Sequence, residues 1–416
     1  MEFKILKEIT TKIASGSTPR GGKNSYTDSG PIALIRSQNI YNNNFTRNGL
    51  VYINNEQAKK LSNVEINKDD ILINITGDSV ARVTMVDSTV LPARINQHVM
   101  ILRPEESMVN KYYLLAYLSS NIAQESLKHL ASDGATRAAL TKRDLETFKI
   151  PNLSFENQEY IGNLLKYINK KIEVNKNIIA NLEELSQTLF KRWFIDFEFP
   201  DENGDPYKSS GGEMVDSELG EIPKEWSIQT LNDISESYNT KRKPLSKLER
   251  EKVTSIYPYY GATKIIDYVD DYLFDGKFIL VGEDGTVQTE EGHPFVQYVW
   301  GKFWVSNHAH ILKGNNLSDE TLMLILNNID IEPYITGAVQ PKISKKNLNG
   351  IKVIIGTKLI YEKFDQYSDI YYKKIREISE EIKNLIELRD TLLPKLMSGE
   401  LEIPDDIEVN EDELSI

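Results

Sequence analysis

The sequence predicts a mixed α/β chain in which two similar globular segments stand in tandem and each is followed by a long helix. Three observations predict this fold: an internal repeat, two stretches with heptad spacing, and short β-rich runs that alternate with short helical stretches. With 416 residues, of which 40% are hydrophobic, the chain is large enough for more than one packed core.

The internal repeat has one constant offset of 203 residues. At this offset Gly134–Arg137 falls on Gly337–Gln340, and Leu182–Leu185 falls on Leu385–Leu388. A register that holds without a gap over roughly sixty residues indicates a duplication. A duplicated chain is suited to a partner that also comes in two halves.

The globular segments are expected at residues 1–153 and 216–356. The runs Ile71–Ile75 and Phe278–Val281 are typical of buried strands, whereas Tyr112–Leu118 is typical of a helix. This alternation predicts mixed α/β domains. A linker rich in turn-forming residues, 200–215, separates the first helix from the second globular segment.

The two long helices are expected at residues 154–199 and 357–401. Their four- and three-residue steps place one stripe of side chains along each helix, as in the seam of a coiled coil. The predicted seam positions are Ile161, Leu165, Ile168, Ile172, Asn175, Ile179, Leu182, Ser186, Leu189, Trp193, Phe364, Ser368, Tyr371, Ile375, Ile378, Ile382, Leu385, Arg389, Leu392 and Leu396. About forty residues at ~1.5 Å each would make a rod roughly 60 Å long.

The helix ends carry matching signals. Ser154 and Thr357 are expected as N-caps, and Gly399 is expected to end the second helix. Four polar seam positions would weaken the pairing but could fix its register: Asn175, Ser186, Ser368 and Arg389. Pairing of the two helices with each other is the economical interpretation. Packing of each stripe on its own domain, or homodimerisation, is the alternative.

Charge and cysteine content restrict the class of protein. The net charge is −13, yet residues 1–150 hold 19 basic and 15 acidic side chains, so total charge does not exclude a nucleic-acid partner. Much of the negative charge lies in residues 402–416, which we expect to form an acidic tail. Absence of cysteine excludes disulfides and thiolate metal sites, and no apolar run approaches ~20 residues, so a cytoplasmic protein is expected.

The sequence offers no catalytic site and no metal site. Gly16–Lys23 resembles a phosphate-binding loop, but its spacing differs and Asn24 stands where serine or threonine is required. His308 and His310 could face the same way on a strand, but no further ligands accompany them. No adenine methyltransferase motif or glycine-rich cofactor motif is present. The chain by itself is therefore not expected to be an enzyme.

Several polar segments suit a partner with hydrogen-bonding edges. Ser37–Asn39 and Arg94–His98 carry amide and guanidinium groups whose donors and acceptors match base edges. In the second half, Ser306–His308 occupies the place of Asn96–His98, and glycine-containing loops follow the β-rich runs in both halves. Isolated asparagine and glutamine side chains are usually only solvated, but their recurrence in two halves favours a binding function.

The C-terminal segment Leu388–Leu401 resembles the ending of the specificity subunits of type I restriction-modification systems. Gly16–Pro19, Gly134–Arg137 and Ile222–Trp226, together with the repeat, agree with the motif order of that family. The first copy departs from the pattern, since Phe190–Phe197 replaces the Pro-Lys-Leu-Met ending.

The resemblance implies tandem target recognition domains separated by two long antiparallel coiled-coil helices, with one domain for each half of a bipartite DNA site. It also implies partners: two modification subunits, which methylate adenine with S-adenosylmethionine, and ATP- and Mg²⁺-dependent restriction subunits. No cofactor would be bound by this chain directly. An alternative is a non-enzymatic coiled-coil scaffold with two protein-binding domains, and an enzyme with a site assembled from distant residues is a third hypothesis.

Candidate DNA contacts follow from these segments. For the first domain they are Arg20, Lys23, Gln38, Asn39, Arg94, Asn96, Gln97, His98 and Arg137. For the second domain they are Lys241, Arg242, Lys243, Asn307 and His308. Two cation pairs, equivalent under the repeat, are expected to contact phosphates because lysine positions a duplex more than it specifies sequence: Lys142, Arg143, Lys345 and Lys346.

Overall fold

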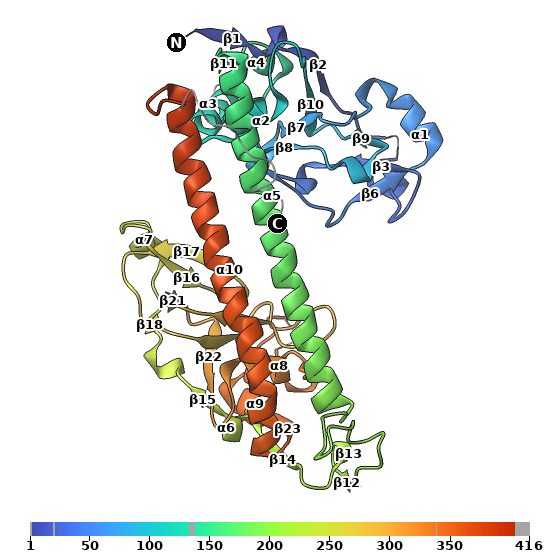
Figure 1. Cartoon of the computed structure of the whole chain (residues 1–416), viewed down its shortest axis with the longest axis vertical. Helices are drawn as coiled ribbons and strands as arrows, with labels where there is room; N and C mark the ends of the chain where they lie inside the picture. The colour runs from blue at the N-terminus through green and yellow to red at the C-terminus, as the bar shows by residue number, and fades with distance from the viewer. Residues whose placement is uncertain (1, 20, 133–137, 338, 404–416) are drawn as a thin grey trace. The chain divides into compact units, whose positions relative to one another are not determined.

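The computed structural model describes residues 2–19, 21–132, 138–337 and 339–403, without the side chains of residues 23 and 24. Two compact units make up the chain: unit 1 comprises residues 1–176 and 379–416, and unit 2 comprises residues 177–378. Figure 1 labels their elements. The predicted Arg20 and Arg137, and the acidic tail from residue 404, lie outside the described residues.

Unit 1 is built on a four-stranded antiparallel sheet with the order β2-β10-β7-β8. A three-stranded sheet with the order β6-β3-β9 contains the parallel pair β3–β9, and β1 pairs with β11 and β4 with β5. The strands are β1 (Phe3–Ile5), β2 (Thr10–Ser15), β3 (Ile32–Ile35), β4 (Ile40–Tyr41), β5 (Asn44–Phe45), β6 (Val51–Ile53), β7 (Ile71–Asn74), β8 (Val83–Met85), β9 (Ala93–Ile95), β10 (Val99–Pro104) and β11 (Lys149–Pro151). The short helices are α1 (Asn55–Lys60), α2 (Lys111–Ser119), α3 (Asn121–Ser132) and α4 (Lys142–Glu146).

Unit 2 repeats this topology, with a four-stranded antiparallel sheet in the order β15-β22-β19-β20. Its second sheet, β17-β16-β21-β18, contains the parallel pair β16–β21, and β14 pairs with β23. The strands are β12 (Met214–Ser217), β13 (Gly220–Pro223), β14 (Ser227–Thr230), β15 (Ser235–Ser237), β16 (Tyr257–Tyr260), β17 (Ile265–Val269), β18 (Phe274–Asp275), β19 (Phe278–Gly282), β20 (Val296–Val299), β21 (Lys302–Val305), β22 (Ala309–Gly314) and β23 (Lys352–Ile355). The short helices are α6 (Leu231–Ile234), α7 (Lys247–Arg250), α8 (Asp319–Leu326) and α9 (Lys345–Asn349).

The central strand of each unit is buried on both faces. In β7, Ile71 and Ile73 belong to the core beneath the helices, whereas Leu72 points into the core between the two sheets. In β19, Ile279 and Leu280 divide in the same way. Side chains alternate along a strand, so a run that is apolar throughout can serve two cores at once.

The two long helices are α5 (Phe155–Phe190), continued by one π-helical turn (Lys191–Ile195), and α10 (Lys358–Ser398). In each unit, a part of α5 packs against an antiparallel part of α10. In unit 1, Asn169 pairs with Arg389 and Asn175 with Glu381. In unit 2, the ring of Phe190 contacts that of Phe364, with centroids 5.9 Å apart. The predicted fold class, mixed α/β domains in tandem with long antiparallel coiled-coil helices, is confirmed.

The predicted seam is largely confirmed. Ile161, Leu165 and Phe364 are fully buried, and Asn175 is 1% exposed. At two positions of α10 the buried residue is the neighbour of the predicted one: Tyr372 is buried instead of Tyr371, and Leu393 instead of Leu392. Both buried residues pack on the core of their unit, which broadens the seam there.

The predicted helix ends are also visible. The Ser154 hydroxyl accepts a hydrogen bond from the Asn157 amide at 3.3 Å, as an N-cap should. Thr357 contributes its carbonyl oxygen, which accepts the Tyr361 amide at 3.3 Å. Gly399 follows α10 with a φ of 75°, the left-handed conformation that glycine favours at a helix end.

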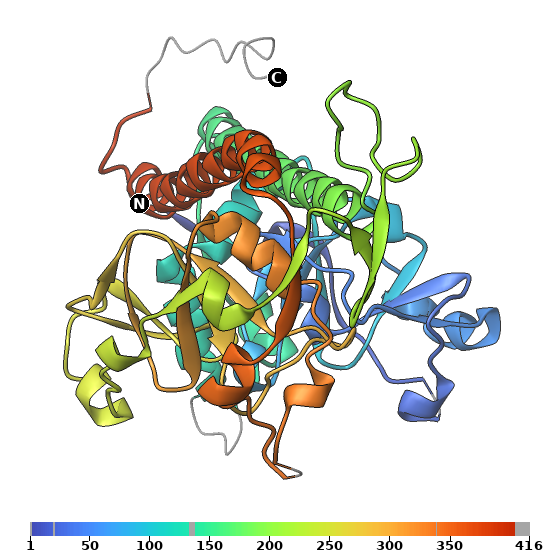
Figure 2. The same cartoon turned by 90° about the horizontal axis from the view of Figure 1, so that it is seen from below.

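Each unit joins its sheet to the long helices through a shorter helix. Figure 2 shows α8 between α10 and the strands of unit 2. Asn110 caps α2 by accepting the amides of Tyr112 and Tyr113, and Ser318 caps α8 by accepting the amide of Thr321. Burial of these short helices is what fixes each sheet to its part of the long helices.

Candidate nucleic-acid interface

In unit 1 the ends of five strands meet at one edge of the sheets. The Gly16 amide, just after β2, donates to the carbonyl oxygen of Val99 at 3.1 Å. The Asn96 amide, just after β9, donates to Ile35 at the end of β3, also at 3.1 Å. The connections at residues 16–19, 36–39, 75–79 and 96–98 therefore form one continuous surface, called edge 1 below.

Unit 2 has the equivalent surface, called edge 2, at residues 238–243, 261–264, 283–286 and 306–308. The Ser306 amide donates to Tyr260 at 2.9 Å, as Asn96 does to Ile35 in unit 1. The duplication seen in the sequence is therefore preserved at the level of individual backbone hydrogen bonds.

A histidine turn occupies the centre of each edge. In edge 1, the His98 amide donates to the Asn96 side chain at 3.1 Å and its carbonyl accepts the Ile75 amide at 3.0 Å. In edge 2, the His308 amide donates to the Ser306 hydroxyl at 3.2 Å and its carbonyl accepts the Glu283 amide at 2.9 Å. The two turns therefore have the same fold, although their side chains differ.

The ring of each histidine is held by the loop that follows the central strand. His98 Nδ1 lies 2.7 Å from the Thr76 hydroxyl, and His98 Nε2 lies 3.1 Å from the Gln97 amide nitrogen. His308 Nδ1 donates to the Asp284 carboxylate at 2.6 Å, and the side chain of His308 remains 48% exposed. Thr76 and Asp284 thus occupy equivalent positions and perform equivalent orienting roles.

The lysine-rich helix starts lie beside these loops. In unit 1 the Gly77 amide donates to Ala138 at 3.1 Å, and in unit 2 the Gly285 amide donates to Pro341 at 3.0 Å. Each of these segments leads directly into α4 or α9, whose first residues are exposed cations: Lys142, Arg143, Lys345 and Lys346. Each edge is therefore flanked by two positive charges.

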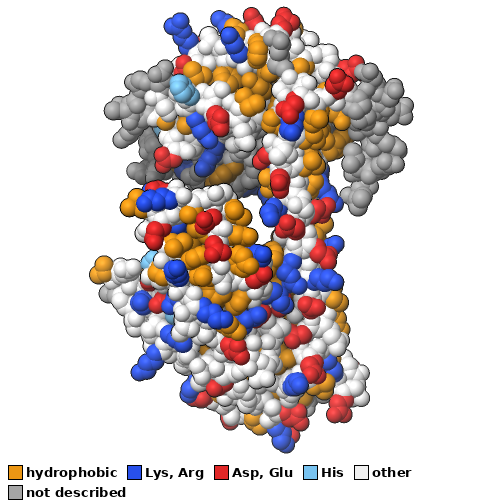
Figure 3. All heavy atoms as spheres, turned by 90° about the vertical axis from the view of Figure 1, so that its left-hand side faces the viewer, with side chains coloured by type: hydrophobic (Ala, Val, Ile, Leu, Met, Phe, Trp, Pro, Cys, Tyr) orange, Lys and Arg blue, Asp and Glu red, His pale blue; other side chains and the backbone are white. Residues whose placement is uncertain are grey.

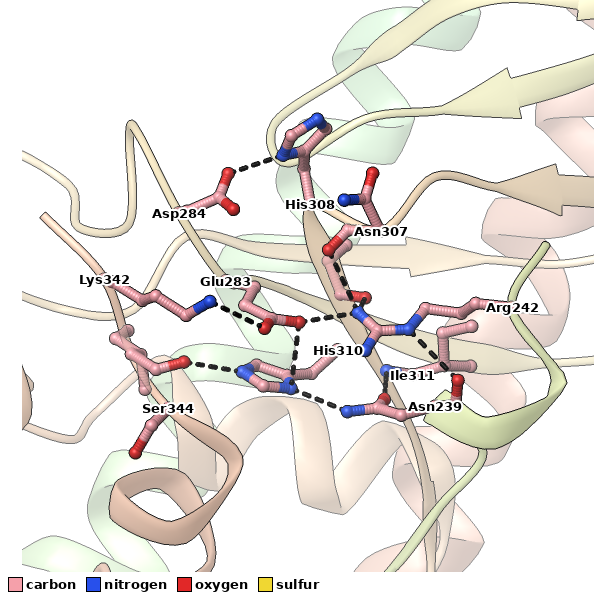
Figure 4. Close-up of polar contacts among 12 residues, drawn as sticks. Asn239, Arg242, Glu283, Asp284, Asn307, His308, His310, Ile311, Lys342 and Ser344 are labelled. Atoms are coloured by element: carbon pink, nitrogen blue, oxygen red, sulfur yellow. Dashed lines mark hydrogen bonds and ion pairs between the residues drawn. The ribbon is translucent and has the colours of Figure 1, made fainter. Parts of the chain in front are cut away.

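Edge 2 also contains a buried charge cluster, drawn in Figure 4. Arg242 Nη1 lies 2.6 Å from Glu283 and donates to the carbonyl oxygens of Asn307 (3.1 Å) and Ala309 (2.9 Å). Lys342 Nζ lies 3.3 Å from the same carboxylate. Burial alone would raise the pKa of Glu283, but the hydrogen bond and charge of Arg242, with the hydrogen bond of Lys342, hold it below its ordinary value.

His310 is neutral in this cluster. The Asn239 side chain accepts the Ile311 amide at 2.8 Å, so its nitrogen faces His310 Nδ1, 2.8 Å away, and donates to it. His310 Nε2 then carries the proton and donates to Ile343 at 2.8 Å. Burial lowers the pKa of His310. Arg242 and Glu283 consequently balance each other while His310 serves as an uncharged link.

Four predicted contact residues are used inside their own domains. Arg94 is 7% exposed and donates to Ala58 and Ala93 at 3.4 and 2.9 Å, with Glu65 at 3.3 Å. Asn39 is fully buried and donates to two carbonyl groups of the following loop. The side chains of Asn96 and Arg242 likewise form hydrogen bonds with backbone groups of their own edge. These side chains shape the two edges and present little polar surface to a ligand.

Most of the other predicted residues whose side chains are described stand at the surface, and the side chain of Lys23 lies outside the described part of the chain. Gln38 and Gln97 are exposed in edge 1, and Lys241, Lys243 and Asn307 are exposed in edge 2. The structure brings Gln38, Gln97 and His98 together through the backbone bonds of edge 1. On the face shown in Figure 3, basic and acidic side chains are interspersed, so local placement matters more than net charge.

Two groups of edge residues were not assigned from the sequence. Thr76 and Asp284 belong to loops that the sequence singled out, but their pairing with a histidine 22 or 24 residues away was not foreseen. The turn at residues 261–264 was missed altogether. Its position, directly after the aromatic strand β16, is the signal that could have revealed it.

A metal site at the two histidines does not form. His308 bonds to Asp284, whereas His310 bonds to a backbone carbonyl in the interior. Across the described residues, no three His, Asp or Glu side chains are grouped in a way that could hold a metal ion. Within the same part of the chain, every helix is too short or too polar to cross a lipid bilayer.

Tandem α/β domains with equivalent edges define a class of two-domain protein with an internal repeat. The family model for the type I restriction modification DNA specificity domain matches residues 1–184 and 223–387, and the chain belongs to this family. It is therefore a type I restriction-modification specificity subunit, a non-catalytic protein that recognises DNA sequence, and its relatives associate with other subunits and DNA.

Individual relatives agree over nearly the whole length. The chain is 26% identical to the type I restriction enzyme MjaIX specificity subunit of Methanocaldococcus jannaschii, over 97% of this chain and 94% of that protein. It is 23% identical to the HindI specificity subunit of Haemophilus influenzae, over 89% and 94% respectively. The crystal structure of the S subunit from M. genitalium has a similar fold, with a TM-score of 0.56, 17% identity, and coverage of 98% of this chain and 96% of that one.

Proposed function

We propose that the chain reads a bipartite DNA site, with edge 1 on one half-site and edge 2 on the other. The observation that supports this proposal is the repeated histidine turn, which has the same backbone hydrogen bonds in both units but different side chains around it. Equivalent surfaces with different chemistry suit two half-sites of different sequence.

The proposed functional domains keep the bounds expected from the sequence, namely recognition domains at 1–153 and 216–356 and helical spacers at 154–199 and 357–401. The spacers would hold the recognition domains at a fixed separation and would dock the partner subunits. The unread gap between half-sites would then follow from the length of the helices, because both domains must reach the same groove of the duplex.

The proposed partners are two modification subunits and, where the system also restricts, ATP-dependent restriction subunits. The modification subunits would bring S-adenosylmethionine and methylate adenine after flipping it out of the duplex. ATP and Mg²⁺ would be used by the restriction subunits, and this chain would bind no cofactor directly. Such a complex would act on DNA in the cytoplasm.

Proposed DNA contacts are the members of the predicted set that are exposed, together with the half-buried His98. They are Gln38, Gln97, His98, Lys142, Arg143, Lys241, Lys243, Asn307, His308, Lys345 and Lys346, to which Arg20, Lys23 and Arg137 are added from the sequence alone. Arg94, Asn39, Asn96 and Arg242 would support these residues from beneath.

Single-molecule mapping of methylated bases in host DNA, with this gene intact and deleted, tests the proposal. A two-part adenine motif with a fixed gap should be lost on deletion and restored by the gene on a plasmid. An unchanged methylation pattern, together with protein partners recovered by a tag on this chain, would instead support the scaffold hypothesis.

A further inference from the structure

Some features are common to both edges and others are found in one edge only. If the proposed function holds, this difference separates residues that contact the DNA backbone from residues that contact bases. Features common to both edges suit what is common to both half-sites, above all the sugar-phosphate backbone. Features that differ can serve base recognition. The shared features are the histidine turns and the paired cations at the starts of α4 and α9.

The main unshared feature is the turn after the parallel strand pair. In edge 1 this turn, residues 36–39, is a 3-10 helix held by a 2.9 Å hydrogen bond from the Asn74 side chain to the Ser37 carbonyl. In edge 2 the corresponding turn, residues 261–264, closes with a 2.8 Å bond from the Gly261 amide to the Lys264 carbonyl. Both turns leave the same strand end but follow different paths.

The turn in edge 2 is placed firmly beside the shared features. Gln297 donates to the carbonyl oxygens of Gly261 and Ala262, at 3.1 Å each. A Cβ on Gly282, which directly precedes the loop of Asp284, would lie 3.4 Å from the Ala262 carbonyl. The turn is therefore rigid at its base, while Lys264 at its end is exposed.

We propose that these two turns read the bases, through Gln38 in edge 1 and Lys264 in edge 2, while the histidine turns and the paired cations grip phosphates in both half-sites. A glutamine amide matches the N6 and N7 edge of adenine, and a lysine ammonium matches O6 and N7 of guanine. The Gln38 amide is held toward Gly49 by a 3.2 Å hydrogen bond, so it is oriented before DNA arrives.

The histidine turn of edge 2 has the geometry to contact a phosphate. Asp284 fixes His308 through Nδ1, so Nε2 is directed away from the loop and can donate to a phosphate when it is protonated. The exposed amide groups of Gln97 and Asn307, at equivalent positions, are further donors. With Lys345 and Lys346 nearby, edge 2 offers several donors that carry no base information.

Chromosomal replacement of this gene by variants, followed by methylation mapping, separates the two roles. Lys264→Ala should reduce discrimination about tenfold at one position of one half-site, as expected for loss of a base contact. Gln38→Ala should do the same in the other half-site. Lys224→Ala serves as a matched control, because this exposed lysine pairs with Glu213 on the β12–β13 hairpin, outside edge 2.

The combined variant Lys345→Gln/Lys346→Gln should leave the methylated motif unchanged. Its complex, purified through a tag on this chain, should bind all DNA sequences more weakly, and the slope of log affinity against log salt should fall by about 2. His308→Ala should also weaken binding without changing the motif, and its thermal midpoint checks that the fold is kept.

Two results would overturn this division of roles while leaving the bipartite function intact. One is a motif that stays unchanged in Lys264→Ala and Gln38→Ala. The other is a motif that loses a base preference in Lys345→Gln/Lys346→Gln or His308→Ala. If deletion of the whole gene leaves methylation unchanged, the proposed function itself fails, and the division of roles fails with it.

Discussion

The carboxylate of Asp365, on α10, accepts a 2.7 Å hydrogen bond from the hydroxyl of Ser318, the N-cap of α8. In unit 1, Gly162 occupies the equivalent position, 203 residues earlier, and a Cβ there would lie 2.5 Å from the side-chain oxygen of Asn110, the N-cap of α2. Both units thus join a long helix to the cap of a short helix, one by a hydrogen bond and the other by close approach.

Gly162→Ala should therefore destabilise the protein although alanine favours helices. The added methyl group must displace the cap of α2, and overpacking of this kind costs about 1–3 kcal/mol. Denaturant unfolding would measure the cost. Glu159→Ala, on an exposed face of the same helix, should change the free energy of unfolding by less than about 0.5 kcal/mol.

Glu320→Ala should be one of the most damaging single substitutions in unit 2. The Glu320 side chain is 2% exposed and pairs with Lys277 at 2.8 Å and Arg376 at 3.0 Å. Removal of this buried carboxylate leaves two partly exposed cations without their partner and the Tyr298 hydroxyl without its acceptor, which costs about 1.5–3 kcal/mol. The thermal midpoint should drop well below that of Glu221→Ala, an exposed control, and equal midpoints would contradict a structural role for the pair.

The stability of unit 2 should decline as the pH falls below about 6.5. Burial lowers the pKa of His310 from its ordinary value of 6.5, so the unfolded chain binds a proton that the folded chain does not. This contribution is present above the unfolded pKa and is lost as the pH falls toward the folded pKa. His310→Gln should flatten the dependence of the unfolding midpoint on pH between 5 and 7.

Asn175→Leu should stabilise the helix pair of unit 1 while weakening its register. Asn175 is 1% exposed in the seam and donates to Glu381 at 2.9 Å. A leucine at this position would gain about 1–2 kcal/mol of apolar burial. The loss of this buried polar link should appear as self-association in sedimentation experiments, because a buried asparagine favours one pairing over others.

The fold could be predicted from the sequence because the spacing of hydrophobic residues along a helix reflects which of its faces is buried. Seam residues such as Ile161 and Phe364 are buried as the heptad pattern predicted. The prediction that Tyr371 lies in the seam was wrong, because heptad spacing along one helix gives no information about the shape of the surface against which that helix packs. Tyr372 lies against Tyr298 of β20, with ring centroids 5.4 Å apart, and this contact with a strand widens the seam.

The candidate site was only partly accessible, for a different reason. Arg94 and Gln97 both belong to the segment 94–98, yet Arg94 is buried and Gln97 is exposed. A polar side chain that supports a loop and a polar side chain that faces a ligand can be the same type of residue, so the sequence does not tell them apart. Only the path of the backbone distinguishes them, and the pairing of His308 with Asp284 depends on that path.

The division of the long helices between the units also determines the order in which a ribosome can complete them. Unit 2 is one continuous stretch, residues 177–378, whereas unit 1 takes Leu393, Leu396 and Met397 into its core. Domains generally fold as their chain emerges. The core of unit 1 must therefore wait until Leu393, Leu396 and Met397 have been synthesised, after all of unit 2. A chain released between the two events would carry a complete unit 2 and an unfinished unit 1.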